Sequence, residues 1–141
     1  FEQYEHPGNP YVYSQTTGDI PKLVNRIEEF AKSADASDTH LQIICPDDDY
    51  WPLPWYLRRF TRVGWFHDVP DGRPGGLIVT QPTLQSRLNR YLYVDQPPGQ
   101  RHLYGWFPVF DDRREVYLRP HVPLQTYVRL DEWNKFEQGR P

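Results

Sequence analysis

The sequence has 141 residues, of which 38% are hydrophobic and 16% aromatic, and its formal net charge is −3. This length suits a single soluble domain over residues 1–141, and a net charge so close to zero gives no electrostatic reason to expect a nucleic-acid partner. Cys45 is the only cysteine, which excludes an intrachain disulfide and a cysteine-rich metal site. No apolar run approaches the ~20 residues of a membrane helix. Because the chain opens with Phe1 and contains no methionine, we expect it to be part of a larger protein.

The first half of the chain alternates between strand-like and helix-like segments. Residues 10–17 are rich in aromatic and β-branched side chains and predict a strand. From Asp19 to Ser33 the apolar residues recur at helical spacing, which predicts an amphipathic helix. The run Leu41–Cys45 is typical of a buried strand. Residues 46–60 contain prolines that suit a helix start, and their later part predicts a short amphipathic helix.

The middle of the chain continues this alternation. Strands are predicted at Val63–Phe66 and Gly76–Thr80, and the segment between them is rich in proline and glycine, which indicates a loop. Thr80 can cap a helix that continues through Tyr91, because leucines recur on one face of that segment.

The last forty or so residues predict a hairpin and a closing helix. Segments 102–110 and 115–118 look like two strands joined through Asp111–Arg114. Residues 122–136 carry apolar side chains at helical spacing, with Pro123 near the start, and predict a helix. Taken together, these segments indicate an α/β domain with a central mixed, mostly parallel sheet of about five strands flanked by amphipathic helices.

The strongest candidate site follows the predicted buried strand Leu41–Cys45, because open α/β sheets usually bind ligands at the carboxyl ends of their strands. Carboxylates there can accept hydrogen bonds from sugar hydroxyls, and tryptophan rings offer flat faces for a sugar. In the alternative interpretation the aspartates cap the following helix and the tryptophans pack in the core. The candidate ligand-binding residues are Asp47, Asp48, Asp49, Tyr50, Trp51, Trp55 and Arg58.

Other chemistry has weaker support. A metal site is disfavoured because adjacent aspartates point in different directions and lack the alternating spacing of a calcium-binding loop. The five histidines do not have the spacing of metal ligands. The sequence motifs of serine hydrolases, nucleoside-triphosphate sites and dinucleotide sites are missing. We therefore predict no metal and no cofactor, and we identify no complete catalytic set. Five arginines can clamp a phosphate or a carboxylate, although most are expected to be solvated or paired: Arg58, Arg59, Arg113, Arg114 and Arg119.

Three strings of the sequence together resemble a known family. They are Asn9–Thr17, Asp49–Arg58 and Arg119–Arg129, and the most distinctive part reads Trp-Pro-Leu-Pro-Trp-Tyr-Leu-Arg over residues 51–58. These strings resemble the C-terminal soluble tail of polytopic membrane proteins related to the dolichyl-phosphate-mannose protein mannosyltransferases. Some archaeal members of that family are called flippase-activity-associated proteins of N-glycosylation.

The resemblance implies a parent protein in the cell membrane, a glycosyltransferase-like protein that uses a polyprenyl-phosphate sugar donor. Its catalytic acidic residue and donor site would lie in the membrane portion, and none of the matching strings contains them. This domain would be an accessory domain on the extracytoplasmic side. Its partners would be the transmembrane part of the same polypeptide and a glycan or lipid-linked sugar, and it would assist acceptor or donor binding or docking.

Two alternatives of a different class remain open. The first is a free-standing sugar-binding or protein-binding module without catalysis. The second is an independent α/β enzyme that uses the edge at Asp47–Asp49. Such an enzyme would need a base or a nucleophile that faces this edge, and the sequence does not show one.

Overall fold

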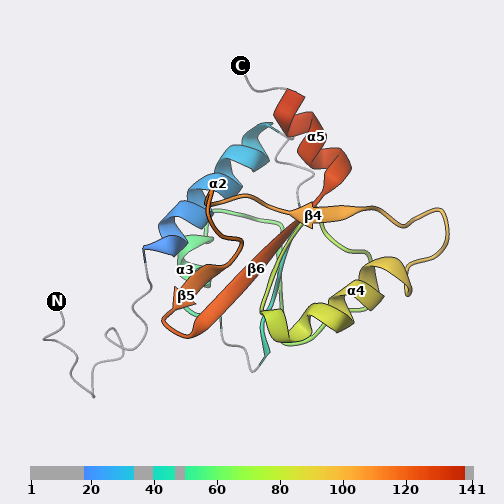
Figure 1. Cartoon of the computed structure of the whole chain (residues 1–141), viewed down its shortest axis with the longest axis horizontal. Helices are drawn as coiled ribbons and strands as arrows, with labels where there is room; N and C mark the ends of the chain where they lie inside the picture. Colours follow the sequence, from blue (N-terminus) through green and yellow to red (C-terminus); the bar gives the residue numbers. More distant parts are fainter. Residues whose placement is uncertain (1–17, 34–39, 47–49, 139–141) are drawn as a thin grey trace, which may run out of the picture.

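The structure, a computed structural model, describes residues 18–33, 40–46 and 50–138 (Figure 1). Within these residues a mixed sheet of six strands runs in the order β2-β1-β3-β6-β4, and β5 pairs with β6 beside this path. The strands are β1 (Leu41–Ile44), β2 (Val63–Phe66), β3 (Leu77–Thr80), β4 (Tyr104–Trp106), β5 (Val116–Arg119) and β6 (Val122–Arg129). The helices are α2 (Asp19–Ser33), α3 (Leu53–Tyr56), the 3₁₀ helix η4 (Pro82–Leu84), α4 (Gln85–Tyr93) and α5 (Leu130–Gln138). None of these helices has the length and apolar composition needed to cross a membrane.

The α/β class and the mixed sheet expected from the sequence are confirmed. β1 pairs in parallel with β2 on one side and with β3 on the other, so that Leu41 lies opposite both Val63 and Leu77. Beyond β3 the pairing is antiparallel, because β6 runs against β3, β4 and β5. The described sheet therefore has six strands where the sequence indicated about five, and its parallel part is confined to β2, β1 and β3.

Helices cover both faces of the sheet. Alternate residues of a strand point to opposite faces, and Leu41 and Ile43 pack in a cluster with side chains from α2, α3 and α5. Ile44 packs instead in a second cluster with side chains of α4. In Figure 1, α4 lies on the opposite side of the sheet from α2 and α3. The predicted helix Asp19–Ser33 is confirmed, and its apolar face is buried through Ile20, Leu23, Ile27 and Phe30.

The connection between β2 and β3 passes across β1 without a helix. Parallel strands cannot be joined by a tight turn, so this connection needs its own support. The Gly75 backbone N–H donates a 2.9 Å hydrogen bond to the Gln42 side-chain oxygen. The Tyr91 hydroxyl donates to the Gly72 carbonyl oxygen (3.0 Å), and the Tyr104 hydroxyl donates to the Gly75 carbonyl oxygen (2.7 Å). These bonds tie the connection to the sheet and to α4.

The prediction of one closing helix over residues 122–136 was wrong in its first half. Residues 122–129 form β6, and the helix begins only at Leu130. β6 is buried on both faces in its central part, so its apolar side chains do not alternate with polar ones. Leu124, Tyr127 and Val128 then fall at positions i, i+3 and i+4, which imitate a helical period.

Other expected boundaries also change. The predicted hairpin between residues 102–110 and 115–118 was wrong, because β4 and β5 each pair with β6. The hairpin is formed by β5 and β6, and His121 in its turn has a positive φ of 71°. Thr80 stays in β3 and the helical segment begins at Pro82, so Thr80 is no helix cap. The strand predicted at residues 10–17 lies outside the described residues.

Candidate functional site

The residues that the sequence proposes as a site belong to the segment that follows β1. Asp47, Asp48 and Asp49 fall outside the described residues, so their part in the site stays a prediction. The described members are Tyr50, Trp51, Trp55 and Arg58, which belong to α3 and its flanking turns.

Two leucines anchor this segment in the core. Leu53 and Leu57 are 1% and 2% exposed, and both belong to the core cluster beneath α2. The Leu57 N–H donates a 2.9 Å hydrogen bond to the Leu53 carbonyl oxygen, which completes one helical turn. Tyr50 adds a third contact, because its ring packs on Trp65 with 5.0 Å between the ring centroids. The backbone of the site is therefore held by the fold itself.

The two tryptophans of this segment point outward. Trp51 and Trp55 are four residues apart, as are Leu53 and Leu57, and the two pairs are offset by two residues. At about 100° per residue this offset places Trp55 on the face of α3 opposite Leu53 and Leu57, whereas Trp51 lies in the turn that precedes the helix. Trp51 is 52% exposed and Trp55 is 55% exposed, so both rings are exposed and not packed in the core; these two side chains are called the aromatic surface below.

Arg58 holds the ring of Trp55. The guanidinium centre of Arg58 lies 3.6 Å from the centroid of the Trp55 ring, a close cation–π contact. One of its N–H groups also donates a 2.7 Å hydrogen bond to the Trp55 carbonyl oxygen. With its guanidinium fixed at two points, Arg58 covers one face of the indole and restricts its rotation.

Arg119 connects the site to β5. Its guanidinium donates a 2.7 Å hydrogen bond to the carbonyl oxygen of Trp51, although 68 residues separate the two in sequence. Four of the five arginines that the sequence offered as anion clamps, Arg58 and Arg119 among them, thus have other contacts. Arg113 donates two hydrogen bonds to Asp19 (2.7 and 2.9 Å), and Arg114 lies over the Trp106 ring.

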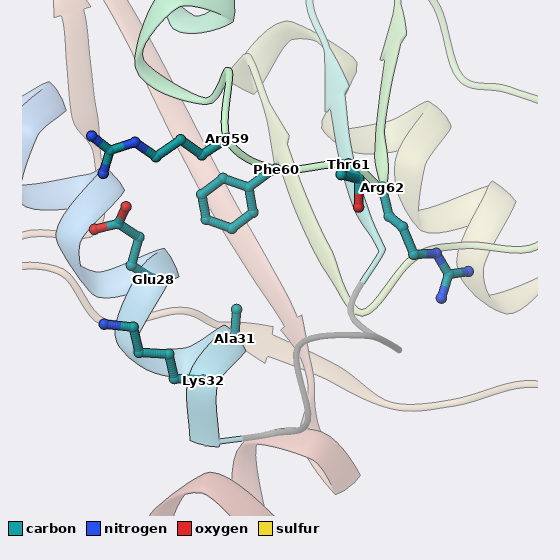
Figure 2. Close-up of a pocket in the computed structure, with 7 residues that line it drawn as sticks. All are labelled: Glu28, Ala31, Lys32, Arg59, Phe60, Thr61 and Arg62. Atoms are coloured by element: carbon teal, nitrogen blue, oxygen red, sulfur yellow. The ribbon is translucent and has the colours of Figure 1, made fainter.

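Arg59 belongs to a pocket that the sequence did not predict (Figure 2). The pocket has a volume of about 220 Å³ and lies between the second half of α2 and the turn after α3. The sequence does not predict this pocket, because its two walls are far apart along the chain. Of its lining residues, only Arg59 is among the arginines proposed from the sequence as anion clamps. Its lining residues are Glu28, Ala31, Lys32, Arg59, Phe60, Thr61 and Arg62.

The described residues contain no cluster of three or more side chains suited to a metal ion. Burial lowers the pKa of His40, and the nearby Arg62 acts in the same direction. Within the described part of the chain, the exposed tryptophans with Arg58 and the pocket beside Phe60 are the strongest candidates for ligand contact. No family model, no curated protein and no solved structure matches the chain significantly.

Proposed function

We propose that this chain is an accessory, extracytoplasmic domain of a membrane glycosyltransferase-like protein that acts on lipid-linked sugars. Its role is to bind a sugar of the donor or acceptor, and the surface formed by Trp51 and Trp55 makes the contact. The observation that carries the proposal is the exposure of both rings, 52% and 55%, on a turn whose opposite face is anchored in the core.

The chemistry of this surface suits a sugar. One face of a pyranose ring presents C–H groups, which pack on the flat face of an indole and leave the sugar hydroxyls at the rim for hydrogen bonds. Arg58 holds Trp55 in place before any ligand arrives, so binding costs less side-chain entropy than it would with a freely rotating ring.

The proposal is tested by following backbone and indole N–H signals of the ¹⁵N-labelled chain during titration with neutral mannose- and glucose-containing glycans. We expect shifts at residues 50–58. Trp55→Ala should weaken binding about tenfold, because it removes the largest apolar contact. Val94→Ala is the matched control, since Val94 is 59% exposed at the end of α4. Absence of shifts at millimolar glycan, or equal affinities for the parent and Trp55→Ala, would overturn the proposal.

A second candidate function rests on the same exposed residues. Tryptophan and arginine are the residues most enriched in protein–protein hot spots, so Trp51, Trp55 and Arg58 also suit a free-standing module that docks a protein. The sequence of the full-length gene distinguishes the two candidate functions. A long hydrophobic region upstream supports the membrane-protein proposal, whereas a signal peptide joined directly to this domain supports the free-standing module.

A further inference from the structure

The pocket in Figure 2 is separate from the aromatic surface, although both use the turn after α3. Arg58 turns back onto Trp55, while the next two residues, Arg59 and Phe60, line the pocket. Its volume of about 220 Å³ is smaller than the ~300–1,000 Å³ of sites for drug-sized ligands. The pocket therefore suits a phosphate group with one sugar or glycerol unit attached, and it is too small for an oligosaccharide.

The lining of the pocket is positively charged. Lys32, Arg59 and Arg62 contribute cations, and Glu28 is the one acidic residue in the lining. Figure 2 shows the charged ends of Arg59, Glu28 and Lys32 along one side of the pocket, with Arg62 on the other. A phosphate monoester carries a charge of about −1.5 to −2 at neutral pH, which is opposite in sign to the predominantly basic lining.

Two of these cations have no partner in the described part of the chain. Lys32 and Arg59 form no ion pair there, and the same holds for Glu28. Elsewhere on the surface comparable side chains are paired, as in the 2.9 Å contact between Arg26 and Glu29 one turn earlier on α2. Lys32 and Arg59 can therefore donate hydrogen bonds to an incoming anion without first breaking an ion pair with another described residue.

The pocket also has an apolar part. Phe60 packs against the main core cluster, which fixes its ring, and Ala31 lies on the neighbouring face of α2. The ring offers a surface for the C–H groups of a sugar or glycerol unit, and the Glu28 carboxylate can accept a hydrogen bond from a hydroxyl. Arginine and lysine at the rim complete a set of groups that fits a phosphorylated polyol.

We propose that this pocket binds the phosphate of a phosphorylated sugar or of a lipid headgroup, with Arg59 and Lys32 as the donors to phosphate and Phe60 as the apolar wall. This proposal does not rest on the sugar-binding role proposed for Trp51 and Trp55. The two sources share one chemistry, a phosphate ester next to a polyol, and they differ in whether the phosphate is presented in solution or at a membrane surface.

The test is a ¹⁵N chemical-shift titration of the 141-residue chain with inorganic phosphate, glucose 1-phosphate and glucose. We expect both phosphates to shift the amide signals of residues 28–32 and 59–62, and glucose alone to leave them unchanged. In the double variant Lys32→Ala/Arg59→Ala the dissociation constant for glucose 1-phosphate should rise about tenfold or more, because two charge-assisted contacts are removed. Both side chains are exposed, so the fold should be retained.

Arg90→Ala is the matched control, because Arg90 is an exposed arginine on α4, which packs on the other face of the sheet. This variant should bind glucose 1-phosphate like the parent. Absence of phosphate-dependent shifts at millimolar concentration would overturn the proposal, as would equal affinities for the parent and the double variant. Shifts at residues 28–32 and 59–62 without any response of the tryptophans to neutral glycans would support this pocket and overturn the proposed sugar surface.

Vesicle sedimentation distinguishes the two sources of phosphate. Binding to vesicles that contain phosphatidylglycerol, lost in the double variant and missing with phosphatidylcholine alone, assigns the pocket to a lipid headgroup. Binding of glucose 1-phosphate without vesicle association assigns it to a soluble phosphorylated sugar. Either result supports a phosphate site. Absence of binding both to the vesicles and to glucose 1-phosphate would overturn it.

Discussion

Arg58 and Trp55 form a fixed pair on the surface, in which the guanidinium lies 3.6 Å from the centroid of the indole ring and donates a 2.7 Å hydrogen bond to the carbonyl oxygen of the same tryptophan. Two contacts from one side chain leave the ring little freedom to rotate. The pair therefore provides a prearranged flat surface on a segment that is otherwise held by leucines.

Replacing Arg58 by alanine should weaken glycan binding several-fold while leaving folding almost unchanged. The indole would regain rotational freedom, and part of its orientation would have to be restored on binding at a cost of about 0.5–1.5 kcal/mol. Glycan titration gives the affinity, and thermal unfolding should show stability within about 0.5 kcal/mol of the parent, since Arg58 is exposed. Arg59→Ala is the neighbouring control and should bind neutral glycans like the parent. Equal effects of the two substitutions would contradict a special role for the Arg58–Trp55 pair.

Leu53 and Trp55 belong to the same short helix, and their substitutions should have opposite consequences. Leu53→Ala removes a side chain that is 1% exposed and should destabilise the domain by about 2–5 kcal/mol, because it leaves a cavity beneath α2. Trp55→Ala should change stability far less, since its ring is 55% exposed. Urea unfolding followed by far-ultraviolet circular dichroism measures both. A larger loss of stability in Trp55→Ala than in Leu53→Ala would show that the tryptophan is a core residue.

The ion pair between Asp19 and Arg113 should make stability depend on pH in the acid range. Hydrogen bonds from Arg113 lower the pKa of Asp19 below its ordinary value of 3.8, against the opposing effect of partial burial. Because the folded-state pKa is lowered, the stabilisation is complete above the pKa of the unfolded chain and is lost as pH falls through the lower folded-state value. Denaturant midpoints measured from neutral pH down to strongly acid pH should fall less steeply in Asp19→Asn than in the parent. Parallel acid limbs for the two proteins would rule out this contribution.

Gly75 should not tolerate a side chain, because the connection between β2 and β3 runs close to the strand that it crosses. A Cβ atom at this position would lie 2.4 Å from the backbone carbonyl oxygen of His40. Gly75→Ala should therefore destabilise the domain by about 1–3 kcal/mol. Gly18→Ala is the control, because nothing lies within 4 Å of its Cβ position, and it should stay within about 0.5 kcal/mol of the parent. Equal unfolding midpoints for both variants would mean that the connection can move away from β1.

Sequence patterns correctly predicted two kinds of element: a helix with one buried face, and short strands in which every residue is buried. The amphipathic spacing from Ile20 to Phe30 identified α2, and short apolar runs identified β1 and β3. β6 was misread because a strand buried on both faces carries no alternation, and its apolar residues happened to fall at helical spacing. Which strands pair cannot be read from such patterns, and this is why β5 was assigned to the wrong hairpin partner.

The sequence proposes a candidate site after β1, and the structure adds the orientation of the side chains that it describes there. The location after β1 followed from the general behaviour of α/β sheets. The sequence left open whether Trp51 and Trp55 point to the core or to solvent. Both are exposed, because Leu53 and Leu57 of the same segment occupy the core. For Trp55, the offset of two residues from each leucine was a usable signal in the sequence. The pocket beside Phe60 has no such signal, because it exists only where α2 packs near the turn after α3.

The pairing of β6 with three other strands also has a consequence for how the chain is made. β3, β4 and β5 all precede β6 in the sequence, and the register joins Leu77 to Val128. During synthesis these three strands leave the ribosome before the strand that unites them, so the antiparallel half of the sheet is completed late. Until β6 arrives, β3 presents an open apolar edge, and this interval is when the nascent chain is most exposed to aggregation.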